Sequence, residues 1–317
     1  MKPDRAISFI EAAYRIDLST EQWLKQLAAA GSKALEPSEG TIAFTYDASD
    51  GTYTHVRAAT IHGFSPRFAH DFFHQETSAE ANQALAELFK TIRCQSMRVM
   101  IERLGVADTF GATLDRHGIQ DMLGVNGLDP AGRGCVLFIA QQQHVRSTRM
   151  THLWSRLAAH ASAGNRLRSR LLSDTGAVHD PTQRAEAILS TNGKIEHATG
   201  LAESIEARAA LRDALVRIDA ARAEMSEAER SVNLWRGLVA GRWSLVEHFE
   251  RDGRRYYLAH KNDPELAPDR GLTLREKQVL GYAELGYSNK LIAYSLGLSA
   301  STVGTLLTKA RRKVGIT

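Results

Sequence analysis

The sequence contains few cysteines and no long uninterrupted apolar run. Cys94 and Cys135 are too few for a disulfide framework and lack the spacing of a metal site, so we expect buried free thiols, with a redox-sensing pair as the alternative. Charged residues interrupt the first thirty positions, and no later stretch approaches the roughly 20 apolar residues that span a membrane. The sequence therefore predicts a cytoplasmic protein with no signal peptide and no membrane contact.

The motifs of common enzyme classes are also absent. His70 and His74 are four residues apart on an expected helix, but the segment reads HDFFH and lacks the glutamate of a zinc metallopeptidase. The segment GVNGLDPAGRG lacks the Lys and Ser/Thr of a phosphate-binding loop, and no serine has the surroundings of a nucleophile elbow. His152 and His160 are interpreted as packing or solvated residues rather than haem ligands. We predict a protein that is not an enzyme and has no catalytic residue, metal site or cofactor.

Length and composition predict two or three domains of mixed structure. The 317 residues are 43% hydrophobic and 24% charged, enough to bury a sizeable core. Residues 5–35 are typical of two amphipathic helices, the second capped by Ser19 or Thr20. Downstream we expect a strand pair turning at Asp50-Gly51, helices over 66–74 and 79–94, a strand over 96–104, a strand pair turning at Asp129, Pro130 and Gly132, and a long helix over 147–172.

This order of elements predicts an antiparallel sheet flanked by helices over residues 1–175. The order is similar to that of GAF domains, small-molecule sensing modules of bacterial regulators. The resemblance implies a sensor with a small-molecule ligand in the N-terminal domain, and it identifies no ligand-binding residue. An unrelated α+β domain used for dimerisation is the alternative. The long helix carries an apolar stripe that indicates core packing or a homodimer seam. Its members are Met150, Leu153, Leu157, Leu167 and Leu171.

A second α+β module is predicted over residues 182–262, after a polar break at 176–181. Hairpin turns are expected at Asn192-Gly193 and Asp252-Gly253, and helices over 203–225 and 227–240. The arrangement resembles a PAS fold, with a plain α+β spacer as the alternative. Residues 263–271 include two prolines and no apolar periodicity, so they form a linker that would let the following unit reorient.

Residues 272–317 show the punctuation of three short helices. Thr273 and Glu276 have the spacing of a capping box before the first helix, and Gly286 is placed to end it. Two serines are placed to cap the later helices, which a glycine separates: Ser288, Ser299 and Gly297. The third helix, residues 300–314, is expected to bury Val303, Leu307, Ala310 and Val314. This all-α unit predicts a helix-turn-helix, whose second helix enters the DNA major groove.

The distribution of charge favours nucleic acid as the partner of this segment. Residues 272–317 contain seven basic and two acidic residues, a balance of +5, whereas the whole chain carries +4, which leaves −1 upstream. No Asp or Glu follows Glu284, so no carboxylate on the third helix would repel phosphates.

The runs LTLREKQVL, SNKLIAYSLGLS, STV and RRKVG resemble the C-terminal DNA-binding domain of LuxR-type transcriptional regulators. The resemblance covers 46 of the 317 residues. It implies a bacterial, nucleoid-associated regulator that binds double-stranded promoter DNA, as a homodimer on a two-fold site, with RNA polymerase as a further partner. Carried over by position, it places Gly304, Thr305 and Thr308 at base edges, and Lys290, Ser301, Thr302, Lys309, Arg311 and Arg312 near phosphates. Ser299 joins this DNA-binding set at the start of the recognition helix.

The sequence departs from that family within the recognition helix. The family usually has Lys after the TV pair and His two residues later, where this chain has Gly304 and Leu306. A helical glycine costs roughly 1 kcal/mol relative to alanine, so we interpret Gly304 as a sign of close backbone approach to DNA or of relaxed selection. Threonine side chains would then read bases with a weak or A·T-leaning preference. The alternative function is a ligand-binding or signalling protein whose helical domain docks a protein partner.

Overall fold

A five-stranded antiparallel sheet, in the order β2-β1-β5-β4-β3, organises the N-terminal region. In this computed structural model its strands are β1 Thr41–Asp47, β2 His55–His62, β3 Cys94–Ser96, β4 Asp121–Leu128 and β5 Arg133–Gln141. The structure describes residues 1–49, 55–75, 78–142, 148–172, 181–223, 227–234, 243–249, 254–264, 266 and 271–315. The two expected hairpins, β1 with β2 and β4 with β5, are confirmed.

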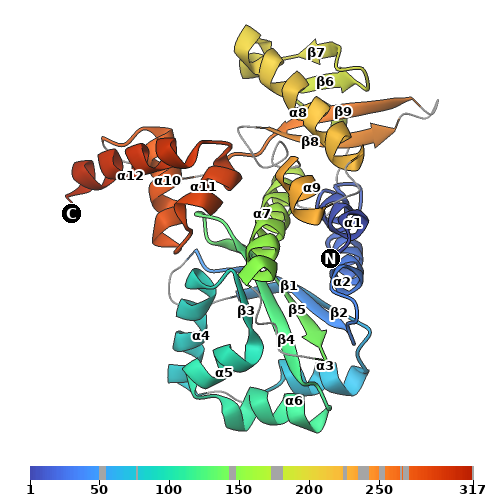
Figure 1. Ribbon diagram of the computed structural model, residues 1–317, viewed down its shortest axis with the longest axis vertical. Coiled ribbons are helices and arrows are strands. Elements are labelled where there is room, and N and C mark those ends of the chain that lie inside the picture. Colours follow the sequence, from blue (N-terminus) through green and yellow to red (C-terminus); the bar gives the residue numbers. More distant parts are fainter. Residues whose placement is uncertain are drawn as a thin grey trace.

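Helices cover both faces of this sheet (Figure 1). One face packs against α1 Pro3–Ala13, α2 Thr20–Ala34 and α7 Thr148–Leu171. The other packs against α3 Pro66–Phe73, α4 Ala79–Thr91, α5 Met97–Leu104, the π-helical turn η1 Ala107–Gly111 and α6 Ala112–Arg116. Strand β5 shows why both faces are apolar, because Leu137 and Ile139 join the first layer and Val136 and Phe138 the second. Neighbouring side chains of a strand point to opposite faces.

One expected strand is a helix. Residues 97–104 form α5, and only the short β3 precedes it. The Ser96 hydroxyl caps this helix by accepting from the Val99 N–H at 3.4 Å, and Gly105 ends it with a φ of 65°. The strand prediction was wrong because a short apolar run fits either period, and here Met97 and Met100 are buried at helical spacing. Helix α4 also ends earlier than predicted, at Thr91.

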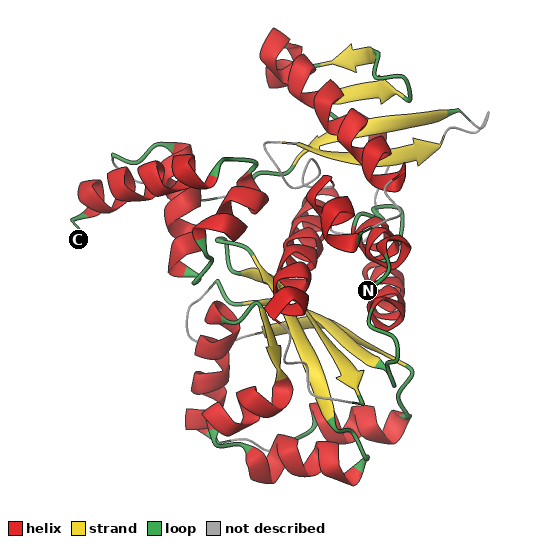
Figure 2. Ribbon diagram, viewed as in Figure 1, coloured by secondary structure: helices red, strands yellow, loops and turns green. Residues whose placement is uncertain are grey.

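A second antiparallel sheet, in the order β7-β6-β9-β8, forms the central region (Figure 2). Its elements are β6 Ala187–Ser190, β7 Ile195–Ala198, α8 Ile205–Ala223, α9 Ala228–Leu234, β8 Trp243–Phe249 and β9 Arg255–Lys261, with 3-10 turns η2 Pro181–Arg184 and η3 Gly200–Glu203. The turn at Asn192-Gly193 is confirmed, since Gly193 has a φ of 82°. The expected turns at Asp50-Gly51 and Asp252-Gly253, the break at 176–180, the helix end at 235–240 and linker residues 267–270 lie outside the described residues.

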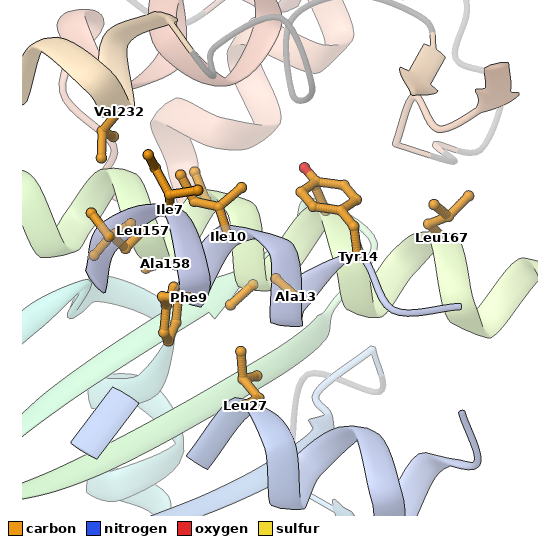
Figure 3. Packing of buried hydrophobic residues seen from close by; sticks show 14 of the residues in the cluster. Ile7, Phe9, Ile10, Ala13, Tyr14, Leu27, Leu157, Ala158, Leu167 and Val232 are labelled. Carbon is orange, nitrogen blue, oxygen red and sulfur yellow. The ribbon is translucent and has the colours of Figure 1, made fainter. Parts of the chain in front are cut away.

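Helix α1 connects the two sheets through one hydrophobic cluster (Figure 3). Ile7 and Ile10 lie on the side of α1 that faces Val232 of α9, and Phe9 meets Trp154 of α7 edge to face, with ring centroids 5.5 Å apart. Leu215 and Ile218 of α8 belong to the same cluster. The fold is therefore mixed α+β, with two antiparallel sheets and a C-terminal helical unit, and the sheets share packed apolar residues.

The two cysteine thiols are poorly ionised near neutral pH. Burial raises the pKa of both cysteine thiols to about 12, so thiolate is scarce near neutral pH. Cys135 is buried as expected, Cys94 is half-buried, and both are free.

Within the described ranges no three His, Cys, Asp or Glu side chains form a group that could hold a metal ion. Over the same ranges no single helix is long and apolar enough to cross a membrane; one bent helix pair could, by length and composition only.

Candidate nucleic-acid interface

The C-terminal unit consists of three helices whose starts are set by local hydrogen bonds. They are α10 Leu274–Glu284, α11 Asn289–Leu296 and α12 Ala300–Val314. Thr273 and Glu276 form the predicted capping box: the Thr273 hydroxyl accepts from the Glu276 N–H at 3.3 Å, and the Glu276 carboxylate accepts from the Thr273 N–H at 2.8 Å. The Ser288 and Ser299 hydroxyls accept from the Leu291 and Thr302 N–H groups at 3.3 and 3.0 Å. All three predicted caps are confirmed.

Helices α11 and α12 cross at 103°. A three-residue turn, 297–299, joins them, and Gly297 has a φ of 66° there. Val279 of α10, Ile292 of α11 and Val303 of α12 are fully buried between the three helices. A crossing of roughly 90–120° with a short glycine-containing turn is the helix-turn-helix geometry.

The last turn of α12 is held by an ion pair rather than by apolar packing. Val314, predicted to be buried, is 39% exposed because it lies one turn beyond Ala310, the last buried residue of the helix. Instead, the Lys313 ammonium donates to the Glu276 carboxylate at 2.7 Å. That hydrogen bond, together with the Thr273 N–H, lowers the pKa of Glu276 to about 2. The end of α12 is thereby tied to the start of α10.

The residues predicted to contact DNA lie together on α12 and at the start of α11. Nine are exposed, and Gly304 is half-buried. The exposed ones are Lys290, Ser299, Ser301, Thr302, Thr305, Thr308, Lys309, Arg311 and Arg312. In Figure 1, α12 projects away from both sheets and ends at the outer edge of the molecule. Whether these residues touch DNA stays a prediction, but their placement leaves them accessible to a large partner.

Two of the expected base-reading side chains use their hydroxyl protons within the helix. The Thr305 hydroxyl donates to the Ser301 carbonyl oxygen at 3.1 Å, and the Thr308 hydroxyl donates to that of Gly304 at 3.0 Å. While these bonds persist, each threonine offers a partner its methyl group and its oxygen lone pairs. Such groups suit apolar contact with thymine methyls better than hydrogen-bond donation to purines.

No close packing among the described residues explains why position 304 is a glycine. A Cβ added there meets no heavy atom within 4 Å among the described residues. By contrast, a Cβ added at Gly281 on α10 lies 2.9 Å from Pro130 of the β4–β5 turn. Gly281 therefore allows close approach of α10 to the N-terminal sheet, whereas Gly304 leaves open space on the exposed side of α12.

The opposite side of the unit is docked onto the N-terminal region through Arg93 and Tyr287. The Arg93 guanidinium lies 4.5 Å from the centroid of the Tyr287 ring and donates to the Leu285 carbonyl oxygen at 2.7 Å. The Tyr287 hydroxyl donates to the Leu128 carbonyl oxygen at the end of β4, at 2.8 Å. A cation over an aromatic ring, one buried hydrogen bond and one partly buried hydrogen bond hold the turn between α10 and α11 against the end of β4.

A second docking point is a buried chain of hydrogen bonds around His160. Its Nε2 lies 2.6 Å from the Tyr294 hydroxyl of α11, which in turn donates to the Val232 carbonyl oxygen of α9 at 2.8 Å. The Tyr14 hydroxyl of α1 lies 3.3 Å from His160 Nδ1. Because Tyr294 uses its proton on Val232, the bond with His160 requires Nε2–H as the donor. Burial lowers the pKa of His160 to about 3, consistent with a neutral imidazole.

The residue just before the predicted linker, Asn262, is also tied to α7. Arg166 Nε donates to the Asn262 carbonyl oxygen at 3.0 Å, and the Asn262 amide donates to the Ala163 carbonyl oxygen at 2.9 Å and to the Ser244 hydroxyl at 2.8 Å. Sequence reasoning missed this docking face. The available signal was the three tyrosines 282, 287 and 294, whose hydroxyls need partners once they are buried.

The geometry of α10 to α12 defines a helix-turn-helix domain, the class of fold that presents one helix to the DNA major groove. Residues 270–317 match the family model described as bacterial regulatory proteins, luxR family. The C-terminal domain is therefore a LuxR-type helix-turn-helix domain, as the sequence predicted.

Two curated relatives carry the same name, HTH-type transcriptional regulator MalT, and come from Vibrio campbellii and Vibrio parahaemolyticus. Each is 33% identical over 90 residues, which is 28% of this chain and 10% of the relative. The chain thus spans about a tenth of the length of these relatives. No solved structure matches the chain. The GAF-like and PAS-like interpretations of the two sheets stay predictions.

Proposed function

We propose that this protein is a DNA-binding transcriptional regulator that reads promoter DNA through α12, as a homodimer on a two-fold site, under control of its N-terminal region. The proposal rests on the difference between two sides of the LuxR-type domain, one exposed and basic and the other packed against the rest of the chain. One side presents exposed Lys290, Lys309, Arg311 and Arg312 with no acidic residue on α12. The other side is docked onto β4, α7 and α9 by buried tyrosines. A basic helix turned outward suits a polyanionic partner.

In this proposal the N-terminal sheet is a GAF-like sensor, the central sheet a PAS-like module, and neither catalyses a reaction. A signal would change the docking contacts of Arg93, Tyr287 and Tyr294, and so the orientation of α12. RNA polymerase is a further proposed partner. Control through the docking contacts is supported by the position of Arg93, which follows α4 of the N-terminal region and contacts two residues of the LuxR-type domain.

The primary test is binding of the full-length protein to random duplex DNA at two salt concentrations. Replacing Lys309, Arg311 and Arg312 by Ala should lower the slope of log affinity against log salt by about two to three, because each lost phosphate contact removes about 0.9. The matched control removes three exposed positive charges from the central region, Lys194, Arg208 and Arg212. Equal slopes for the two triple variants would favour the alternative, in which the helical domain docks a protein partner.

Control by the N-terminal region has a separate test. Arg93→Met removes the hydrogen bond to Leu285 and the cation over Tyr287 while keeping an apolar side chain of similar length. We expect the variant to change DNA affinity or the preferred spacing of half-sites, and to leave the salt slope unchanged because α12 is untouched. An affinity and spacing equal to those of the parent protein would exclude this contact from control.

A further inference from the structure

A cavity of about 290 Å³ lies between the N-terminal sheet and the helical layer of α3, α4 and α5. Phe44 of β1 and Phe138 of β5 line it on the sheet side, and Phe72, Phe89 and Phe110 on the helical side. These rings already touch one another: Phe72 lies edge to face with Phe110, with centroids 5.6 Å apart, and 6.0 Å from Phe138. The cavity is thus an aromatic box built into the second core layer of the sheet.

Among the described residues that line this cavity one side chain is polar, and it has no hydrogen-bond partner among them. Neither Oε1 nor Nε2 of Gln75 has a hydrogen bond among the described residues, although both atoms are buried. Leaving a buried amide unpaired is unfavourable, and such groups in folded proteins usually have a partner from protein, water or ligand. Gln75 therefore holds an unpaired donor and an unpaired acceptor just behind the wall of an otherwise apolar cavity, and a rotation of its side chain would present them to an occupant.

The remaining lining excludes a charged occupant and permits a range of shapes. Among the described residues that line the cavity none carries a charge, so an ion inside would have no counter-charge. Met97 and Met100 form part of the wall, and their flexible side chains adapt to irregular ligands. Two large apolar residues at its edge, Val56 and Phe73, are 54% and 39% exposed. Such exposure is typical of a mouth through which an apolar molecule enters.

The cavity is also connected to the docking contact of the LuxR-type domain. Phe89 lines the cavity, and its carbonyl oxygen accepts hydrogen bonds from the Asn126 amide at 2.5 Å and from Arg93 Nη1 at 3.4 Å. The same Arg93 donates to Leu285 through Nη2 at 2.7 Å. A molecule that displaces Phe89 would therefore move Arg93, one of the residues that hold the domain.

We propose that this cavity is a binding site for a neutral, largely aromatic small molecule with one group that both donates and accepts a hydrogen bond, such as a primary amide or lactam. This inference deepens the proposed sensor function and rests on it. If each non-hydrogen atom of a ligand takes about the 30 Å³ that a water molecule occupies in the liquid, the cavity has room for a ligand of about ten such atoms. The complementary amide of the ligand would pair with Gln75 after the buried amide of that side chain rotates toward the cavity, and the ligand's ring would pack among the phenylalanines.

The experiment uses the full chain labelled with ¹³C in its methionine methyl groups and three probes of equal size: benzamide, benzoate and cumene. Benzamide matches both the box and Gln75, cumene matches the box alone, and benzoate adds a charge. We expect benzamide and cumene to shift the Met97 and Met100 signals, with a tenfold or greater preference for benzamide over benzoate. Met150 packs against the cluster on the other face of the sheet, so its signal is the internal control and should not move.

Two variants make the assignment specific. Gln75→Leu should weaken benzamide binding about tenfold while leaving cumene binding unchanged or tighter, because only benzamide loses hydrogen bonds. Leu104→Trp should fill the cavity and abolish the shifts from both probes. Circular dichroism establishes that each variant is folded, and Gln75→Leu alone suffices if Leu104→Trp does not fold.

Three results would overturn the proposal: no shift at Met97 and Met100 with any probe, equal binding of benzoate and benzamide, or an unchanged benzamide affinity in Gln75→Leu. DNA binding of the same protein samples is measured in parallel. Intact DNA binding without probe shifts would refute the ligand site and leave the proposed regulator standing. Probe shifts in a protein that binds no DNA would refute the regulator and leave the cavity as a ligand site.

Discussion

Replacing Tyr294 by Phe tests the buried chain that holds α11 against α7 and α9. The change removes one oxygen and leaves the His160 Nε2–H and the Val232 carbonyl oxygen without their partner. Tyr294 is 5% exposed and His160 0%, so water cannot replace the lost bonds without rearrangement. Each orphaned buried group costs about 1–3 kcal/mol. We expect the docked state to lose about 3 kcal/mol.

A double-mutant cycle with His160→Leu separates this coupling from loss of packing. In the His160→Leu background the Tyr294 hydroxyl still donates to Val232, and its removal no longer orphans an imidazole N–H. Tyr294→Phe should therefore cost about 1–2 kcal/mol less there than in the parent chain. The control, Tyr256→Phe, removes a hydroxyl from a half-buried position on β9 and should change stability by less than about 0.5 kcal/mol.

The suitable assay is native-state hydrogen exchange of the α11 amides, because local opening is measured without requiring the whole chain to unfold in one step. The opening free energy of these amides should fall in Tyr294→Phe, and amides of β1 should be less affected. Additive effects of the two substitutions, within about 0.5 kcal/mol, would refute the hydrogen-bonded chain.

His160, Glu276 and two helical glycines each make a contribution to stability that can be measured. Burial lowers the pKa of His160 to about 3 in the folded chain, compared with about 6.5 in the unfolded chain. The neutral, buried His160 therefore stabilises the fold fully above pH 6.5, and the free energy of unfolding falls by up to about 1.4 kcal/mol per pH unit toward pH 3. His160→Leu should flatten this slope in urea titrations, and an equal slope would contradict the assignment. Gly304→Ala should stabilise the protein by about 1 kcal/mol, whereas Gly281→Ala meets the β4–β5 turn at 2.9 Å and should not; equal shifts in Tm would argue against that close approach. The pKa of Glu276 is lowered to about 2, mainly by Lys313. The ion pair therefore stabilises the fold above pH 4.5, and this stabilisation is lost as the pH falls toward 2. Lys313→Met should reduce the acid sensitivity measured by circular dichroism, and an unchanged acid profile would exclude the ion pair as the cause of that sensitivity.

The parts of this fold that sequence predicted are those with local chemical causes. Thr273, Ser288 and Ser299 cap helices through hydrogen bonds to residues three positions away, so their spacing alone carries the information. The hairpin at Asn192-Gly193 depends in the same way on a glycine that accepts a positive φ. Residues 97–104 show the limit, because a buried apolar run there satisfies a strand or a helix until its cap and stop are weighed.

The docking face and the cavity could not be predicted because their partners are remote in sequence. His160 and Tyr294 are 134 residues apart, and Arg93 and Leu285 are 192 apart. No periodicity connects such positions. The packing of α7, α9 and α11 brings the first pair together, and the contact between the end of α4 and the end of α10 brings the second pair together. Gln75 is similar, since a single glutamine after a helix has no local signature, and its meaning depends on the phenylalanines around it.

Docking and exposure together constrain how the proposed regulator is controlled. The docked domain leaves all ten predicted DNA-contact residues uncovered or half-covered by its own chain, so release from docking would not unmask them. Docking would instead set the direction in which each α12 points, and two-fold sites demand recognition helices about 34 Å apart. A tenfold change in DNA affinity corresponds to about 1.4 kcal/mol. One charged hydrogen bond of the kind Arg93 makes to Leu285 is worth about as much. A ligand beside Phe89 would therefore need to weaken only that one contact to produce a regulatory response.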